Sequence, residues 1–232
     1  MSQRIAIVSA TKKEIEPVTH FLKEEAFQYS PTQFLLQDLQ VDLLVTGIGI
    51  LSATYSLMNY LMEHSPTAWL QAGIGGAFDR TLEKNKTYLI ESEVLVDFGA
   101  QDHDGKIHTP FDLGWMEADQ FPYSQKIMKC PYLSDELLLP KASGMTTLYA
   151  HGFADKIATL HNGLHGQIEN MEGAAFFYVS LLKNIPFWSL RSISNYVEKR
   201  DTSAWTFDEA IGGLNDHLIA LLTHHKIPII PQ

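Results

Sequence analysis

One carboxylate of this chain, that of Glu172, stands directly against an apolar run: residues 168–179 read IENMEGAAFFYV. Taking a carboxylate out of water costs several kcal/mol unless an ion pair or hydrogen bonds compensate. Two interpretations are open. Glu172 either complements the dipole of the helix that it begins, or it is a perturbed acid of a functional site.

Polar residues and glycines that could do chemistry also follow other apolar runs. They are Glu14 in ATKKEIEPV, the glycine-rich segments GIGIL and GIGGAF, and the pair Ser194 and Asn195. Each has a structural alternative: an exposed first-turn acid, a tight corner, or an Asn in a turn. Neither glycine segment fits a dinucleotide fingerprint or a phosphate loop. Individually these signals are weak.

The elements that position these residues alternate between strand and helix patterns. Short apolar runs predict strands at Arg4–Ser9, Val41–Thr46, Ala68–Ala72, Thr87–Val96 and Phe187–Ile193. Helical spacing predicts helices at Leu51–Glu63 and Phe207–His224, and Phe34–Val45 resembles a hairpin arm. We expect an α/β fold with three layers, α/β/α, around a central mixed sheet. Ligands of such sheets bind beyond the carboxyl ends of the strands, so the candidates should share one rim.

Composition limits the class of protein. The 232 residues are 45% hydrophobic and 19% charged, and no linker-like or repeated segment divides them, so a single domain over 1–232 is expected. A net charge of −10 argues against a nucleic-acid partner. No stretch approaches the roughly 20 apolar residues of a membrane span. The single cysteine, Cys130, fits a reducing compartment, and we expect a cytoplasmic protein.

The sequence MEGAA, followed after a helix by RSISN, resembles the nucleoside phosphorylase and nucleosidase superfamily. TGIG at 46–49, AGIGG at 72–76 and ASG at 142–144 extend the resemblance, which runs from Ile5 to about Ile211. It implies a nucleoside phosphorylase-like fold and cleavage of the bond between a purine base and ribose. It also implies that Glu172 contacts the ribose hydroxyls and that Glu14 holds and deprotonates an attacking water. A carboxylate beside ribose stabilises the oxocarbenium-like charge that appears on reaction.

The same resemblance implies a set of substrate-binding residues around these two acids. They are Ile48, Gly75, Gly76, Thr147, Leu148, Asn170, Met171, Ser194 and Phe207. Met171 would pack against the sugar. Phe207 and Trp205 would line or cap the 5′ side, and the alternative is that these aromatic residues at a helix start belong to the core. The chain departs from the nucleosidases at Thr147, where those enzymes carry a Phe that stacks on the base.

Hydrolysis is favoured over phosphorolysis. Phosphorylases of the superfamily bind phosphate through arginine side chains, one of which lies in the loop after the first strand. In this chain the corresponding segments, SATKKEIEP and GIGGA, contain no arginine. Glu14 would repel phosphate there and suits water. Lys12 and Lys13 leave phosphate open as an alternative, because lysine also binds it.

The expected leaving base is a 6-oxopurine. Adenine-releasing nucleosidases carry Asp after Ile-Ser, where this chain has Asn195, an amide with two N–H donors and one acceptor. The segment SNYVEKRDTSAWTFDEAI resembles the futalosine hydrolases of menaquinone biosynthesis, which release hypoxanthine from futalosine. The alternatives are a methylthioadenosine/S-adenosylhomocysteine nucleosidase, a purine nucleoside phosphorylase, or a non-catalytic nucleoside-binding module. A mere binder would have no use for a water-activating acid.

No metal and no cofactor is expected. His161 and His165 have the spacing of helical metal ligands, but Gly163 lies between them and the Glu of H-E-x-x-H is absent. The irregular excursion Gln101–Lys141 is typical of segments that carry function or contact a partner. Its part Asp102–Phe111 resembles the segment that closes the neighbour's site in dimeric relatives, so we expect a homodimer.

Overall fold

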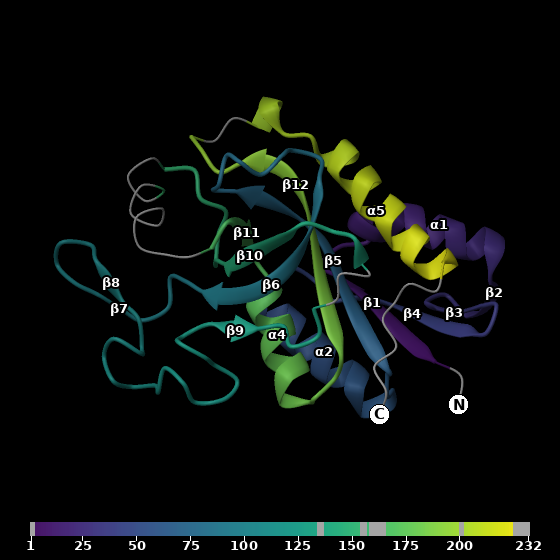
Figure 1. The fold of residues 1–232 in the computed structure, drawn as a ribbon, viewed down its shortest axis with the longest axis horizontal. Coiled ribbons are helices and arrows are strands. Elements are labelled where there is room, and N and C mark those ends of the chain that lie inside the picture. Colours follow the sequence, from purple (N-terminus) through teal and green to yellow (C-terminus); the bar gives the residue numbers. More distant parts are fainter. Residues whose placement is uncertain (1–2, 134–136, 154–156, 158–165, 200–201, 225–232) are drawn as a thin grey trace.

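The computed structural model describes residues 3–133, 137–153, 157, 166–199 and 202–224. Over these residues the chain forms a ten-stranded mixed sheet with helices on both faces (Figure 1). The strand order is β11-β10-β6-β12-β5-β1-β4-β3-β2, and β9 pairs with β6. The α/β prediction with a central mixed sheet is confirmed.

Four parallel strands form the centre of the sheet. These are β1 (Arg4–Ser9), β4 (Leu39–Val45), β5 (Ala68–Ala77) and β12 (Phe187–Tyr196). Side chains on both faces of β1 and β5 are buried, as expected for strands covered by helices on two sides. The strands β2 (Phe27–Ser30) and β3 (Gln33–Leu36) join β4 through antiparallel pairs, which confirms the predicted hairpin arm.

One end of the sheet closes on itself, a feature that the sequence patterns did not predict. The strand β6 (Thr87–Leu95) pairs with β12 and with β10 (Lys141–Thr146), and β10 pairs with β11 (Ile168–Asn170). Because β11 also pairs antiparallel with the end of β5, the strands β5, β12, β6, β10 and β11 form a ring. The segment just before Glu172 is thereby held against Gly76 and Ala77.

The α-helices of the described residues divide into two pairs on opposite faces (Figure 1). One pair is α1 (Glu16–Glu25), preceded by the short helix η1 (Lys13–Ile15), and α5 (Phe207–Thr223), preceded by η3 (Thr202–Ala204). The other pair is α2 (Ile50–Glu63) and α4 (Gly173–Leu182). Each pair covers its own apolar cluster, the first around Leu70 and Leu218 and the second around Trp69 and Phe176.

Two predicted turns are strands in the structure. GIGGA was expected as a corner after Ala68–Ala72, but β5 runs on to Ala77 because β11 and β12 pair with its end. Its glycines are required by close neighbours: a Cβ on Gly75 would lie 2.8 Å from the Glu169 carbonyl oxygen. Likewise β12 passes through Ser194 and Asn195, with a register shift after Ile193. The expectation that these two residues follow the strand is wrong.

The excursion after β6 has little regular structure, as predicted. It holds β7 (Ala100–Gln101), β8 (Ile107–His108) and β9 (Met128–Lys129). The β7–β8 hairpin extends away from the main sheet at the left of Figure 1. None of the helices within the described residues has the length and apolar character that crossing a bilayer requires.

Candidate active site

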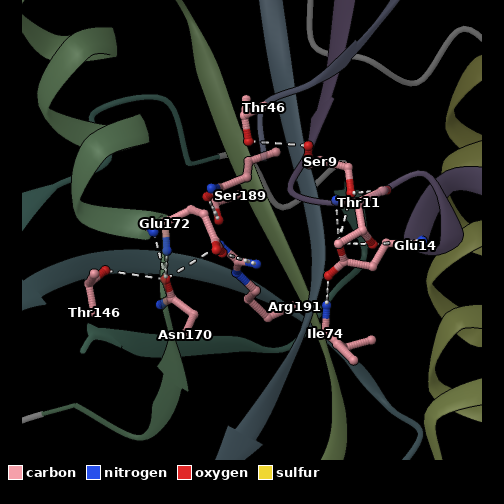
Figure 2. Close-up of polar contacts among 12 residues, drawn as sticks. Ser9, Thr11, Glu14, Thr46, Ile74, Thr146, Asn170, Glu172, Ser189 and Arg191 are labelled. Atoms are coloured by element: carbon pink, nitrogen blue, oxygen red, sulfur yellow. Dashed lines mark hydrogen bonds and ion pairs between the residues drawn. The ribbon is translucent and has the colours of Figure 1, made fainter. Parts of the chain in front are cut away.

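The carboxyl ends of the central strands bring the two predicted acids to one rim. Glu14 lies in η1 directly after β1, and Glu172 lies immediately before α4. Figure 2 shows the side chain of Arg191, from β12, between them. Both carboxylates are buried, so each must be explained by its partners.

Glu14 is held by four hydrogen bonds. Its Oε2 accepts from the Ser9 hydroxyl at 3.1 Å and from the Thr11 amide and hydroxyl at 3.0 and 2.8 Å. Its Oε1 accepts from the Ile74 amide at 3.1 Å. Because three donors gather on Oε2 and one on Oε1, the spare acceptor capacity of the carboxylate lies on Oε1. A fixed carboxylate with one such oxygen can hold a water and take its proton.

Glu172 bridges two elements rather than capping its own helix. Its Oε1 accepts from the amide of Gly49, the residue before α2, at 2.9 Å. Its Oε2 lies 3.9 Å from Nη1 of Arg191. Burial raises the pKa of the Glu172 carboxyl, and the neighbouring guanidinium and the Gly49 amide oppose that rise. The simple interpretation of a first-turn acid does not account for these contacts.

Arg191 is a site residue that sequence reasoning missed. The RSISN motif contains it, but the motif was used for Ser194 and Asn195 only. The guanidinium is buried, with Nη2 3.4 Å from the Asn170 Oδ1. It reaches the rim because residue 73 is glycine: a Cβ there would lie 2.2 Å from Arg191 Nη1 and 3.1 Å from Glu14 Oε1. Gly73 therefore allows the cation and the Glu14 carboxylate to approach one position from two sides.

Asn170, predicted to contact substrate, uses its side chain inside the protein. Its Oδ1 accepts from the amides of Glu172 and Gly173 at 3.1 and 2.6 Å, and its Nδ2 donates to the carboxyl of Glu93. Thr146 accepts from the Ala174 amide at 2.7 Å. These two side chains satisfy the first amides of α4, a task that the N-cap side chain performs in many helices and that Glu172, at that position, does not perform. Any substrate contact of Asn170 is left to its backbone.

Asn195 lies opposite Gly76, on the face where that glycine leaves space. Its Oδ1 accepts from the Ser194 hydroxyl at 2.8 Å, and its Nδ2 donates to the Tyr196 carbonyl at 3.0 Å. These partners fix which end of the amide carries the nitrogen. One Nδ2 hydrogen has no partner assigned by these contacts and can be offered to a ligand.

The other predicted substrate-binding residues differ in exposure: Met171 is half-buried, whereas Ser194, Gly75 and Gly76 are buried. Ile48, Leu148 and Phe207 are exposed. Thr147 is buried, and its hydroxyl donates to the Asn170 carbonyl at 3.4 Å. Trp205 packs edge to face on Phe207, with ring centroids 5.1 Å apart. The ligand contacts of the whole set remain predictions.

A buried His151 cluster lies at the neighbouring strand ends and was also missed. His151 Nδ1 lies 2.5 Å from Glu169 Oε1, and its Nε2 lies 3.3 Å from Asp97 Oδ2. Burial disfavours the imidazolium, but the two carboxylates raise the pKa of His151 to about 9. Tyr149 packs against the same ring with centroids 4.6 Å apart. The cluster thus ties the chain after Thr147 to the ends of β6 and β11.

Metal ligation has no candidate within the described part of the chain. No three His, Cys, Asp or Glu side chains of that part are arranged to share a metal ion. The predicted pair His161 and His165 lies outside the described residues.

Comparisons with known proteins identify the family of this chain. A family model described as "Phosphorylase superfamily" matches residues 4–224. Two curated relatives, each called futalosine hydrolase, are 27% identical: one from Thermus thermophilus, aligned over 74% of this chain and 76% of its own length, and one from Streptomyces coelicolor, over 75% of each.

Solved structures resemble the fold over nearly the whole chain. A 5′-methylthioadenosine/S-adenosylhomocysteine nucleosidase of Helicobacter pylori gives a TM-score of 0.79 at 15% identity, covering 97% of this chain and 99% of its own. A futalosine hydrolase of the same organism gives 0.77 at 15% identity, with the same coverage. At such low sequence identity these structures show a similarity of fold alone.

Proposed function

The chain belongs to the phosphorylase superfamily, and from that membership and the geometry of the rim we propose that it hydrolyses the N-ribosidic bond of a purine nucleoside, with futalosine as the preferred substrate. The observation that carries the proposal is the pairing of two buried carboxylates, Glu14 and Glu172, on either side of Arg191. The curated futalosine hydrolases that the chain resembles support the choice of substrate.

In this proposal Glu172 acts through its charge. As the bond to the base breaks, positive charge develops on ribose, and a carboxylate fixed beside it stabilises the transition state more than the ground state. Arg191 at 3.9 Å and the Gly49 amide at 2.9 Å keep that carboxylate ionised and oriented. Met171, next to Glu172 in the chain, packs against the sugar.

Glu14 supplies the nucleophile. A water on its Oε1 would lie near Gly73, where the absence of a Cβ leaves space that the Arg191 guanidinium also approaches. Glu14 takes a proton from that water while the water oxygen bonds to the anomeric carbon of ribose. The base departs with the electron pair of the broken bond. Asn195 donates its remaining N–H to the departing oxopurine as negative charge develops there.

The direct test is base release from a panel of futalosine, inosine, methylthioadenosine and S-adenosylhomocysteine. We expect the fastest release from futalosine, with free hypoxanthine as the product. Faster release from methylthioadenosine would make this a nucleosidase of the adenine-releasing kind. No release from any member would contradict the hydrolase and favour the binding module.

Turnover is expected to need neither phosphate nor an added metal. A phosphate ion near Glu14 Oε1 would meet two carboxylates, whereas Lys13 of the first loop is already paired with Asp208 of α5 at 2.8 Å. The measurement is the rate of base release in phosphate-free buffer containing a chelator, compared with the rate after phosphate is restored. A rate that depends on phosphate, with ribose 1-phosphate among the products, would establish phosphorolysis instead.

Phosphorolysis remains the second candidate because of Arg191. Its Nε has no hydrogen-bond partner among the described residues, and its Nη1 contact to Glu172 is long. A buried guanidinium with spare donors is a natural anion ligand. The product analysis just described separates the two functions.

We also propose a homodimer, supported by an apolar stripe on α2. Leu51, Tyr55, Met58 and Met62 recur at helical spacing, and the exposed fractions of Leu51, Tyr55 and Met62 are 87%, 73% and 76%. The excursion adds exposed aromatic side chains at Trp115 and Phe121. Large exposed apolar stripes of this kind mark association surfaces. The stripe begins two residues beyond Gly49, so a second subunit there would lie beside the Glu172 end of the site.

The double substitution Tyr55→Glu/Met62→Glu should convert the protein to a monomer and lower base release. Two buried charges at an interface are costly, whereas the same residues on a free surface are harmless. Sedimentation velocity measures the mass, and Phe27→Glu on the distant edge strand β2 is the matched control. A wild-type monomer with full activity would refute the dimer.

A further inference from the structure

A third acid, Glu93, lies beneath the site and has no part in the mechanism so far. It belongs to β6 and is 1% exposed. Its Oε1 accepts from the Thr146 hydroxyl at 2.8 Å and from Asn170 Nδ2 at 3.1 Å. Its Oε2 has only the longer contact of 3.3 Å with the same Asn170 nitrogen.

Both partners of Glu93 hold the start of α4. The Thr146 hydroxyl donates its hydrogen to Glu93, which leaves the lone pairs of this oxygen free to accept. It accepts from the Ala174 amide at a distance of 2.7 Å. An Asn that gives its NH₂ to Glu93 turns its oxygen the other way, toward the amides of Glu172 and Gly173. Glu93 therefore sets the direction of both acceptors. Through them it fixes the backbone that carries Glu172, and Figure 2 shows Asn170 and Thr146 beside Glu172.

The fold makes room for this carboxyl with two glycines from different elements. A Cβ on Gly144 of β10 would lie 2.1 Å from Glu93 Oε2, and one on Gly173 of α4 would lie 2.4 Å from it. A side chain at either position would displace the Glu93 carboxyl from the place that it occupies. The backbone of two other elements, β10 and α4, thus lies close to this one acid.

The charges around Glu93 favour its neutral form. Arg191 is the cation that faces it, and Glu172 is the second carboxylate, with Glu14 beyond. One guanidinium cannot neutralise three carboxylates in a buried site. Burial raises the pKa of Glu93 to about 7, although Thr146, Arg191 and Asn170 act against the rise. The weakly contacted Oε2 is the oxygen that can carry the proton.

We propose that Glu93, in its neutral form, is a positioning residue for the reaction: it orients Asn170 and Thr146, and through them Glu172, and leaves Arg191 to pair with Glu172 alone. This inference rests on the proposed function for its catalytic consequence. When Glu93 loses its proton, its charge competes for Arg191 and disfavours the Glu172 carboxylate. The rate should therefore fall as pH rises through about 7.

The test compares Glu93→Gln with Glu93→Ala, and Glu91→Gln serves as the matched control because Glu91 is exposed on the same strand. Glutamine imitates the neutral acid, so Glu93→Gln should retain kcat at pH 6 within about threefold and lack the fall between pH 6 and 8. Glu93→Ala should lose about 100-fold in kcat at every pH, with KM changed far less, because misplacing a reacting group by about 1 Å costs that much. Glu91→Gln should follow the wild type throughout.

A second measurement does not depend on activity. An acid with a higher pKa in the folded than in the unfolded chain takes up a proton on folding, so its contribution to stability falls as pH rises from about 4.5 to about 7. The urea midpoint of Glu93→Gln should show less of that fall than the wild type does. If the wild type releases no base from any nucleoside, the proposed function fails and the urea midpoints still decide whether Glu93 holds a proton.

Two results would overturn the proposal. One is a pH profile of Glu93→Gln that matches the wild type in both rate and urea midpoint. The other is a loss in Glu93→Gln as large as that in Glu93→Ala, since this would mean that the site needs the charge of Glu93.

Discussion

Glu172→Gln is expected to lower kcat by about 100- to 1,000-fold, the size of a lost electrostatic contribution at a reacting centre. Glutamine keeps an oxygen for the Gly49 amide, which donates at 2.9 Å, so the fold should survive. What disappears is the negative charge beside ribose and the partner of Arg191. The binding of a substrate analogue, measured by calorimetry, should change much less than kcat.

The pH dependence of the wild type offers a second measure of Glu172. Burial raises the pKa of this carboxyl, and only its ionised form stabilises an oxocarbenium ion. The rate should therefore fall on the acid side as pH drops through that raised pKa. The residual rate of Glu172→Gln should lack this acid limb. A near-normal rate in the variant would remove Glu172 from the mechanism.

Glu14→Gln should cost a comparable factor for a different reason, because it removes the base for water. An added nucleophile that needs no deprotonation, such as azide, should restore part of the base release in Glu14→Gln and none in Glu172→Gln. Glutamine also places an NH₂ group against a group that donates a hydrogen bond to Glu14 in the wild type, such as the Ser9 hydroxyl or the Ile74 amide. The stability of Glu14→Gln to unfolding must therefore be measured together with its rate. Glu24→Gln, an exposed acid of α1, is the control.

The sequence was informative about the strands and helices and less so about where they end. The strand β1 and the helix α2 were predicted nearly to the residue, since burial on both faces and helical spacing leave local patterns. The ends of β5 and β12 were missed because glycine and polar residues usually signal a turn. Here they continue strands whose partners lie far along the chain, since the end of β5 pairs with β11 and with the end of β12. Closure of the ring is a non-local pairing, and no short pattern encodes it.

The same distinction applies to the site. The rim could be predicted because parallel strands align their carboxyl ends, and Glu14 and Glu172 do lie there. The support for Glu172 could not be predicted, because Glu93, Asn170 and Arg191 come from three different strands. Buried polar residues inside strands are a usable signal only once the pairing of those strands is known. Glu93 follows Glu91 and Ser92 in TYLIESEVL, so the sequence of this strand does not by itself single out Glu93 as the buried acid.

Asn195→Asp is expected to change the choice of base, lowering the ratio of hypoxanthine to adenine release by at least tenfold. The Asn195 Nδ2 donates to the Tyr196 carbonyl at 3.0 Å and keeps one hydrogen for the ligand. An ionised Asp has no donor, so it would set an oxygen against that carbonyl and another against the oxopurine. A buried acceptor left without a partner costs about 1–3 kcal/mol, and the middle of that range, about 2 kcal/mol, corresponds to roughly 30-fold.

The same repulsion predicts where the variant gains. A carboxylate facing the Tyr196 carbonyl is driven to take up a proton, and a protonated Asp can give that proton to the imidazole nitrogen of adenine. The measurement compares hypoxanthine and adenine release from nucleosides with the same 5′ group, in wild type and variant. Asn184→Asp is the matched control, because Asn184 is exposed in the turn before β12 and already accepts from Tyr132. An unchanged ratio in Asn195→Asp would reduce Asn195 to a strand residue that satisfies its neighbours, and the preference for an oxopurine would lose its physical basis in the chain.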